Sequence, residues 1–158
     1  MQETQLCIDL KNPLSDYEVR EKIILDSSQY LQSDDDEREP PCHFALRWEG
    51  NKKRSVIEVL KTDQVKTALK KKNKQSEIPR ELTENDSGTF VPILALECRG
   101  LEPYAFHPHT GEFSVTSLGG MEFSPDTIDL SDGDWADYDE ENDLSVSISD
   151  FEAKFVAV

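Results

Sequence analysis

Three cysteines carry the most reactive side chains of this chain, and their spacing argues against both a disulfide framework and a catalytic thiol. Cys7, Cys42 and Cys98 are an odd number and lie far apart. Disulfide-stapled domains usually carry an even number of closely spaced cysteines, so we expect reduced thiols. A nucleophilic cysteine needs a low pKa and a base, which Arg99 beside Cys98 does not establish. Cys98 ends an apolar run and is predicted to be a small buried hydrophobe.

Histidines are the next candidates for metal or acid–base chemistry. Cys42 and His43 are adjacent, and neighbouring side chains on a strand point to opposite faces, so the pair would rarely hold one ion. His107 and His109 flank Pro108, a pattern typical of an exposed turn. No Ser-His-Asp order, phosphate-binding glycine loop or Gly-x-Ser-x-Gly motif is present in the sequence. We therefore predict that the protein is not an enzyme.

An acidic segment at 129–141 holds the best candidates for partner binding. Its aspartates superficially resemble calcium ligands in spacing, but the ligand order and flanking helices of an EF-hand are missing from the pattern. Aromatic rings among carboxylates suit the binding of a basic or amphipathic protein segment. The candidate partner-binding residues are Trp135, Asp137, Tyr138, Asp139 and Glu140. The alternative is that the rings of Trp135 and Tyr138 turn inward and anchor the segment to the core.

Charge narrows the class of partner. Acidic residues outnumber basic ones by 33 to 17, and the formal net charge is -16. A surface this negative repels phosphate backbones, so we expect no nucleic-acid partner. The charge is uneven, because basic residues gather at 66–80, whereas 34–39 and 126–143 are strongly acidic. A protein partner is compatible with this distribution, and we expect the chain itself to be a monomer.

Length and hydropathy predict one cytoplasmic domain without a membrane partner. A chain of 158 residues is long enough to bury a core, and we expect a single β domain over 1–158 with polar loops at 26–41 and 61–89. No window approaches the roughly 18 consecutive apolar residues of a membrane-spanning helix. The first four residues lack the basic start of a signal peptide.

Short alternating segments predict an all-β fold with little helix: two antiparallel sheets packed face to face, as in a sandwich or barrel. A glycine-containing turn at 49–53 joins two of these segments into a hairpin. The lysine run and the Ile78-Pro79 pair favour a mobile loop over a helix within 61–89. The predicted strands are 6–10, 22–25, 43–48, 55–60, 90–98, 112–116, 121–123, 144–148 and 152–158.

Two longer phrases carry a family resemblance. They are Glu97-Cys98-Arg99-Gly100-Leu101-Glu102-Pro103 and Ile128-Asp129-Leu130-Ser131-Asp132-Gly133-Asp134-Trp135-Ala136-Asp137-Tyr138-Asp139-Glu140. Together they resemble the CXXC-motif-containing zinc-binding protein family of eukaryotes, most clearly over 90–158, and residues 80–92 are similar to the lead-in of that family's Cys-Arg-Gly phrase. The resemblance implies a small β-rich protein with structural zinc on two CxxC knuckles and a poorly defined activity.

The chain departs from this family pattern at the metal ligands. The turn 52–55 and the strand 56–59 match the part that follows the second knuckle, which places its cysteine positions at Trp48 and Asn51. The first knuckle falls near 7–11, where Cys7 is the one thiol. A structural zinc site uses four Cys or His ligands, and an indole cannot be one. We therefore predict that the zinc is lost, that no cofactor is bound, and that Trp48 fills the ion's place by packing.

The predicted function is that of a non-catalytic scaffold or protein-interaction module without zinc. The alternative is a structural zinc protein with ligands from Cys7, Cys42, His43 or a partner chain. An enzyme that uses Cys98, or His107 and His109, is the least favoured reading. We also expect the N-terminus to be too short for the opening strands usual in the family.

Overall fold

Short strands make up most of the structure. A computed structural model describes residues 5–31 and 41–158. The strands are β1 (Gln5–Lys11), β2 (Val19–Asp26), β3 (Phe44–Leu46), β4 (Ser55–Val59), β5 (Leu96–Arg99), β6 (Glu102–His107), β7 (Val115–Thr116), β8 (Glu122–Phe123), β9 (Trp135–Asp139) and β10 (Leu144–Ile148). The helix α1 covers Thr62–Lys71, and the single 3-10 turns η1 and η2 cover Glu84–Asp86 and Pro125–Thr127.

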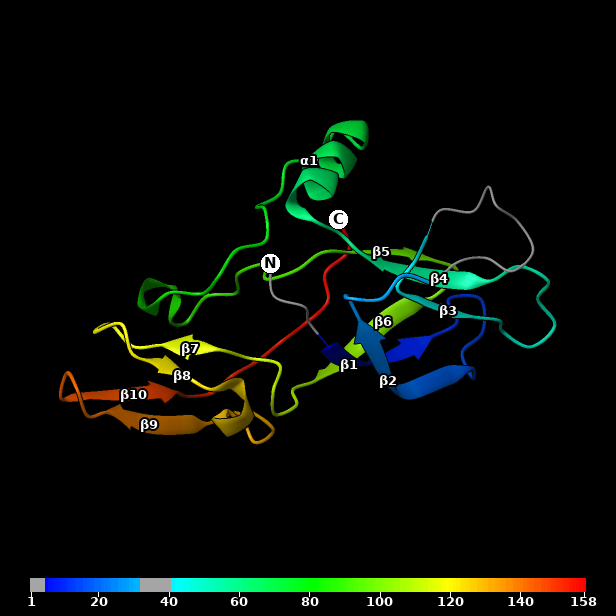
Figure 1. Ribbon diagram of the computed structural model, residues 1–158. Helices are drawn as coiled ribbons and strands as arrows, with labels where there is room; N and C mark the ends of the chain where they lie inside the picture. The colour runs from blue at the N-terminus through cyan, green and yellow to red at the C-terminus, as the bar shows by residue number, and fades with distance from the viewer. Residues whose placement is uncertain (1–4, 32–40) are drawn as a thin grey trace.

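These strands form four small antiparallel sheets, which confirms the predicted all-β class. The two larger sheets have the strand orders β2-β1-β6 and β3-β4-β5, and the two smaller ones are the hairpins β7-β8 and β9-β10. Figure 1 shows the larger sheets at one end of the molecule and both hairpins at the other. We call these ends the first lobe and the second lobe. Each lobe encloses its own core between two sheets.

The core of the first lobe lies between its two three-stranded sheets. Alternation along β1 directs Leu6, Ile8 and Leu10 into this core, and the two residues between them are buried as well, so both faces of β1 are covered. The opposite sheet supplies Ile57, which is fully buried, and the segment that follows β3 supplies Trp48. Residues far apart in the sequence therefore share one apolar interior.

The core of the second lobe is smaller and rich in aromatic side chains. Phe123 of β8 and Trp135 of β9 meet edge to face, with ring centroids 5.3 Å apart. Phe113 contacts the rings of both Phe151 and Phe106, at 5.3 Å and 6.3 Å. Because Phe106 packs against the first core and Phe151 against the second, this row of rings joins the two lobes.

The C-terminal segment after β10 also joins the lobes, and the strand predicted at 152–158 is wrong. This segment has no regular secondary structure. In Figure 1 it is the red trace that leaves the second lobe and runs toward β5. Phe151 packs against the second core and Phe155 against the first. The apolar residues of this segment thus anchor it to two separate cores. A strand paired along one sheet edge would not contact both.

The predicted mobile loop within 61–89 contains the helix α1, so the prediction against a helix is wrong there. Val65, Ala68 and Leu69 have the i, i+3, i+4 spacing of one helix face, and Val65 is buried. The backbone N–H of Lys61 donates to Gln64 Oε1 at 2.7 Å, and Gln64 Nε2 donates to Glu58 of β4 at 3.0 Å. Tertiary contacts thus fix a helix that would be marginal alone.

The helices in the described residues are all too short and too polar to cross a membrane.

Two strands were not expected from the sequence. β9 lies inside the predicted acidic loop and pairs with β10 from Trp135↔Ile148 to Asp139↔Leu144. β6 pairs with β1 and forms an edge of its sheet, where Pro103 is tolerated because one side of the strand needs no N–H donors. The strand predicted at 90–98 begins only at Leu96.

Of the predicted polar loop 26–41, residues 32–40 lie outside the described part of the chain.

Candidate functional site

Residues 48–51, where the family resemblance predicts the second zinc knuckle, form a tight turn at the edge of the first lobe's core. The backbone N–H of Asn51 donates to the carbonyl of Trp48 at 3.1 Å, and Gly50 adopts a positive φ of 79° between them. The Trp48 side chain is only 2% exposed. The turn therefore keeps the compact spacing of a knuckle while its first residue points into an apolar interior.

Polar contacts hold the Trp48 ring in place. Its indole N–H donates to the carbonyl of Gly100 at 2.7 Å, and the hydroxyl of Ser55 donates to the same oxygen at 2.9 Å. The Arg20 guanidinium lies 5.3 Å from the centroid of the Trp48 ring, within the range of a cation–π contact. A buried indole needs such a hydrogen-bond partner, and here one carbonyl satisfies the ring and locks the turn between β5 and β6.

Gly100 gives the Cys-Arg-Gly phrase a structural explanation. It has a positive φ of 74°, and an added Cβ would lie 2.5 Å from the Ser55 hydroxyl oxygen. A side chain at this position would clash with the Ser55 hydroxyl, which donates to the same Gly100 carbonyl as the Trp48 indole. The phrase therefore serves the packing around Trp48, a role that sequence reasoning missed because 52 residues separate the two partners.

The donor atoms near the knuckle position do not fit zinc. The turn offers an indole at 48 and an amide at 51, whereas a structural zinc site needs four Cys or His ligands. Across residues 5–31 and 41–158, no group of three or more His, Cys, Asp or Glu side chains is arranged to hold a metal ion. The residues around Trp48 instead form a continuous apolar core with satisfied polar atoms.

Burial also keeps two of the three thiols unreactive. Burial raises the pKa of Cys98 to about 11, and the neighbouring Glu97 carboxylate adds to the shift. The pKa of Cys7 is raised by burial first and by the Glu112 and Asp9 carboxylates next. A thiol with a raised pKa is a poor nucleophile at neutral pH. All three cysteines lie in the described part of the chain and are thiols rather than disulfides, as the sequence predicted.

His43 serves the packing of the first lobe. Its Nδ1 accepts the backbone N–H of Val59 at 2.8 Å, so this nitrogen is unprotonated and occupied. The ring lies 4.3 Å from the centroid of Tyr30. Burial lowers the pKa of His43, while the Glu58 and Asp26 carboxylates oppose that shift. Zinc ligation through Nδ1 would break the bond to Val59, so His43 is poorly placed to join Cys42 as a ligand.

The two histidines expected in an exposed turn differ in their surroundings. His109 is exposed, as predicted, but His107 is the last residue of β6, and its Nε2 lies 2.8 Å from Asp9 Oδ2. The other Asp9 oxygen accepts the backbone N–H of Lys22 at 2.8 Å. This aspartate sits at a register irregularity of β1 and links both neighbouring strands. The sequence signal that could have predicted this role is the position of Asp9, a carboxylate inside the apolar run 6–10.

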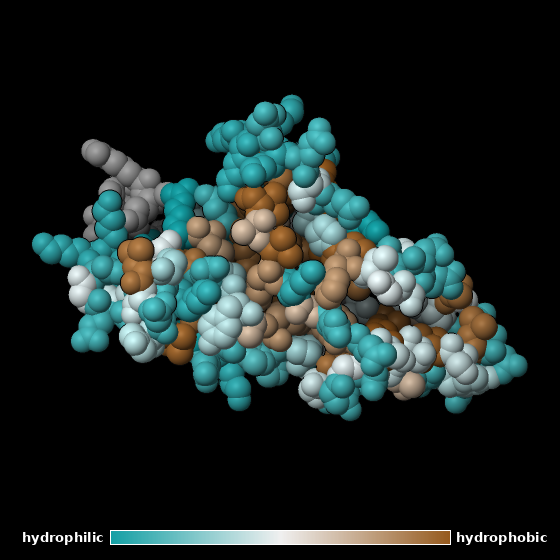
Figure 2. All heavy atoms as spheres, turned by 180° about the vertical axis from the view of Figure 1, so that it is seen from behind, coloured by the Kyte–Doolittle hydropathy of each residue, from teal (hydrophilic) through white to brown (hydrophobic). Residues whose placement is uncertain are grey.

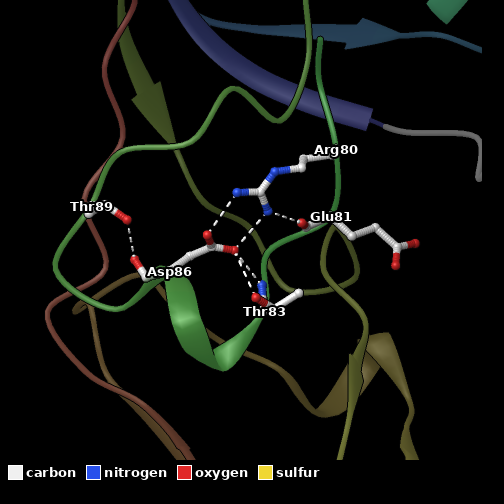
Figure 3. A network of polar contacts seen from close by, with 5 residues as sticks. All are labelled: Arg80, Glu81, Thr83, Asp86 and Thr89. Atoms are coloured by element: carbon white, nitrogen blue, oxygen red, sulfur yellow. Dashed lines mark hydrogen bonds and ion pairs between the residues drawn. The ribbon is translucent and has the colours of Figure 1, made fainter. Parts of the chain in front are cut away.

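A bidentate ion pair closes the loop between α1 and β5 (Figure 3). Both terminal guanidinium nitrogens of Arg80 lie 2.8 Å from the carboxylate oxygens of Asp86. The same carboxylate accepts the backbone N–H of Thr83 at 2.8 Å, and the Thr89 hydroxyl donates to the Asp86 carbonyl at 2.7 Å. The Arg80 hydrogen bonds hold the pKa of Asp86 well below its usual range. These residues belong to the family-like phrase 80–92, and they form a structural lock.

The candidate binding segment divides between the core and the surface. Trp135 is 9% exposed and donates its indole N–H to the Thr127 carbonyl at 3.1 Å. Asp139 is fully buried and accepts hydrogen bonds from the Ser117 hydroxyl at 2.5 Å and the Asn142 side chain at 2.9 Å. The Ser117 bond is the main reason that the pKa of Asp139 is lowered. These two residues therefore hold the second lobe together.

The remaining three candidates, Asp137, Tyr138 and Glu140, are exposed, and Tyr138 shows 42% of its surface to solvent. The alternative that both rings turn inward thus holds for Trp135 and fails for Tyr138. Successive strand residues point to opposite faces, which accounts for the difference between Trp135 and Tyr138. The exposed ring of Tyr138 on β9, with exposed carboxylates nearby in sequence at Asp137 and in the following turn at Glu140, remains available for contact with another molecule.

Comparisons with known proteins agree with this architecture. The sequence profile of the family described as "CXXC motif containing zinc binding protein, eukaryotic" matches residues 1–156. The UPF0587 protein CG4646 of Drosophila melanogaster is 42% identical over 74 residues, which cover 47% of this chain and 44% of that protein. The human CXXC motif containing zinc binding protein is 41% identical over 71 residues, 45% of this chain and 43% of the relative. The matched part thus spans less than half the length of these curated relatives.

Solved structures share the fold at low sequence identity. A hypothetical protein from Plasmodium falciparum superposes with a TM-score of 0.73 at 20% identity, covering 93% of this chain and 81% of the other. The crystal structure of C1orf123 gives a TM-score of 0.71 at 22% identity and covers 94% of this chain and 82% of the other. On the family match over nearly the whole sequence, the chain belongs to the eukaryotic CXXC motif containing zinc binding protein family.

Proposed function

We propose that this protein is a non-catalytic interaction module of its family in which a tryptophan-centred core has replaced the zinc knuckle. The observation that carries the proposal is Trp48, buried at the knuckle position with its indole N–H bonded to the Gly100 carbonyl. Zinc in such a site contributes directly to folding, so its loss must be offset by other contacts. A buried aromatic ring with a satisfied N–H supplies apolar burial and a long-range hydrogen bond at that point.

The chemistry of the remaining candidates supports a non-catalytic role. Two thiols have raised pKa values, one imidazole nitrogen of His43 is occupied, and His107 is paired with Asp9. A nucleophile needs an activating base and a low pKa, and these environments favour the opposite state. We expect the protein to act without a cofactor.

The surface proposed for the partner is the exposed part of 137–140, at the end of β9 and in the turn that follows it. Asp137, Tyr138 and Glu140 combine two carboxylates with a half-exposed aromatic ring. Such a group suits a basic protein segment, because arginine or lysine can contact the ring face while the carboxylates supply charge. Asp139 between them is committed to Ser117 and Asn142 and is excluded from this surface.

Elemental analysis of the purified, untagged protein tests the loss of zinc, combined with melting curves in the presence and absence of a chelator. The human relative, prepared in parallel, is the control for zinc retention. We expect a negligible zinc content and a melting temperature that the chelator leaves unchanged. Near-stoichiometric zinc with a chelator-sensitive melt would overturn the proposal and favour a structural zinc site with ligands from Cys7, Cys42, His43 or a partner chain.

Fluorescence anisotropy with a short labelled peptide of alternating arginine and leucine tests the binding surface. The variant combines Asp137→Asn, Tyr138→Ser and Glu140→Gln. A matched control makes the same change in charge elsewhere, with Glu81→Gln and Glu84→Gln in the exposed loop before β5. Weaker binding by the first variant alone would support the surface on β9. Equal weakening in both would indicate nonspecific attraction to an acidic protein and would contradict it.

A further inference from the structure

A basic surface of ordered structure stands out on this acidic protein. Residues 61–74 contain six lysines and one aspartate in a chain whose net charge is -16. Lys66, Lys70 and Lys71 lie on α1, and Lys72 is its C-cap residue. The turn after the helix is also fixed, because the Lys74 backbone N–H donates to the Leu69 carbonyl at 3.0 Å. We call Lys66, Lys70, Lys71, Lys72 and Lys74 the lysine cluster.

Stability alone does not account for this cluster. Within the described part of the chain, no ion pair involves any of its five lysines, although Lys11, Arg80 and Arg99 pair with acidic neighbours. Lys66 and Lys70 lie at i and i+4, where like charges weaken a helix by a few tenths of a kcal/mol. Lysines in the last turn do complement the helix dipole, which explains Lys70 and Lys71 but not Lys66 or Lys74.

Apolar surface adjoins the basic helix. The Leu60 backbone N–H donates to the Ala95 carbonyl at 2.9 Å, which joins the start of α1 to the segment that enters β5. Within that segment Ile93 is exposed, and the C-terminal segment also leaves apolar side chains open, at Val156 and Val158. Figure 2 shows, from behind, hydrophobic atoms gathered directly beneath the hydrophilic residues of α1. Basic and apolar groups therefore meet at the base of the helix.

We propose that α1, with the apolar surface at its base, is a docking surface for an acidic segment of a partner protein that carries bulky apolar side chains. Carboxylates of the segment would face the lysine cluster, and its apolar side chains would cover the exposed residues below. The argument for the occupant is charge complementarity, since five lysines gather here on a chain with 33 acidic residues.

The size of the surface favours a short peptide segment over a membrane or a nucleic acid. The ten residues of α1 span about 15 Å, roughly the length of five extended residues. A flat anionic membrane or a duplex would extend beyond a helix of this length and meet the electrostatic field of a protein whose net charge is -16. Arg80, which could grip a phosphate with two hydrogen bonds, is already engaged by Asp86.

Fluorescence anisotropy with the full chain tests this docking surface. The probe is a short labelled peptide in which glutamate alternates with leucine and phenylalanine, and the variant is Lys66→Glu with Lys70→Glu. Lysine and glutamate are both good helix formers, so circular dichroism should show the same helix content in the variant as in the parent protein. The matched control is Lys52→Glu with Lys53→Glu, which makes the same charge change at the exposed turn before β4. We expect the α1 variant to weaken binding at least tenfold, about 1.4 kcal/mol, and the control less than twofold.

Three further probes make the outcome decisive. Polyglutamate of the same length should bind more weakly than the mixed peptide, because it leaves the apolar surface uncovered. Tighter binding to phosphatidylserine vesicles or to single-stranded DNA would overturn the choice of a peptide partner. Equal losses in the α1 and control variants, or no binding of the mixed peptide at low salt, would overturn the docking surface itself. The zinc content does not enter this test, so its outcome is separate from that of the proposed function.

Discussion

The two lobes are each anchored by a buried tryptophan, but the two anchors bridge very different distances along the chain. Trp48 donates its indole N–H to a carbonyl 52 residues away, on the turn between β5 and β6. Trp135 donates to a carbonyl only 8 residues away, in η2. The first lobe is therefore closed by a long-range contact, at the turn where we predict the family's second zinc knuckle. The second lobe is closed locally.

This difference has an energetic consequence. A contact between distant residues must repay a larger loss of chain entropy, so its removal releases more of the chain. In the second lobe, other contacts stabilise the core together with Trp135. Asp139 accepts hydrogen bonds from Ser117 and Asn142, and the ring of Phe123 packs edge to face on Trp135. The first lobe should thus depend more strongly on its single tryptophan than the second lobe does.

The largest expected effect is that of Trp48→Ala. Removing a fully buried tryptophan costs about 3–5 kcal/mol in the free energy of unfolding, and Trp48 is 2% exposed. Trp135→Ala should fall at the lower end of that range, because Trp135 is 9% exposed and its neighbours hold one another. Urea unfolding measures both, and the tryptophan left in each variant reports by fluorescence on its own lobe. A larger loss for Trp135→Ala would reverse the comparison.

The sequence predicted the first lobe better than the second, for a physical reason. The segments 43–48 and 55–60 alternate because one face of each strand covers a core, the segment 6–10 is an apolar run, and all three contain strands. β9 was missed because its carboxylates dominate the composition. The buried Asp139 accepts hydrogen bonds from Asn142 in the following turn and from Ser117, which is 22 residues away and is brought close only by the fold.

The candidate site was predictable where it depended on residue type and not where it depended on distant partners. The placement of Trp48 and Asn51 at a knuckle stays a prediction from the neighbouring phrase, and the structure shows that Trp48 is buried. The acceptor on Gly100 could not be found from local pattern, because only the fold brings the two together. The helix α1 was missed for a similar reason, since Val65 and the Gln64 contact to Glu58 stabilise it.

A pair of glycines sharpens the comparison between the lobes. Both Gly100 and Gly120 have positive φ, at 74° and 92°, but an added Cβ would meet Ser55 Oγ at 2.5 Å only at Gly100, and nothing within 4 Å at Gly120. Gly120→Ala should cost about 1 kcal/mol in the free energy of unfolding through backbone strain alone, and Gly100→Ala about 2–3 kcal/mol. Chemical denaturation gives both values.

A double-mutant cycle with Ser55→Ala separates the two contributions at Gly100. The cost of Gly100→Ala should fall when the Ser55 hydroxyl is already absent, since the closest clash is then gone. Strictly additive costs would mean that the clash is relieved by a backbone shift, and that the tight packing around the Trp48 acceptor contributes little.

The lobes should also respond to different ranges of pH. Burial lowers the pKa of His43, so the folded first lobe favours the neutral ring that accepts the Val59 N–H. Its contribution to stability is complete above the unfolded pKa of about 6.5 and is lost as the pH falls through the lower folded value. The Ser117 hydrogen bond lowers the pKa of Asp139. That contribution in the second lobe is complete above about pH 3.9 and is lost only in stronger acid.

Urea midpoints measured across this range of pH check the assignment. His43→Asn keeps an acceptor for the Val59 N–H without titrating, so it should flatten the decline between pH 7 and about pH 5. Asp139→Asn should leave that decline intact and flatten part of the loss below about pH 4. If His43→Asn leaves the mildly acidic decline unchanged, another group is responsible and the difference between the lobes does not extend to pH.

The smallest effect is expected on the outer side of β9, next to the carboxylate that matters most to the second lobe. Asp137→Asn with Glu140→Gln should change the free energy of unfolding by no more than about 0.5 kcal/mol, because both side chains are exposed. Asp139→Asn, between them, should destabilise clearly, since it alters a buried group with three hydrogen bonds. Thermal melts of the two variants decide the point. A marked loss in the first would mean that the surface carboxylates of β9 are used for folding, and the case for keeping them there for a basic partner would fail.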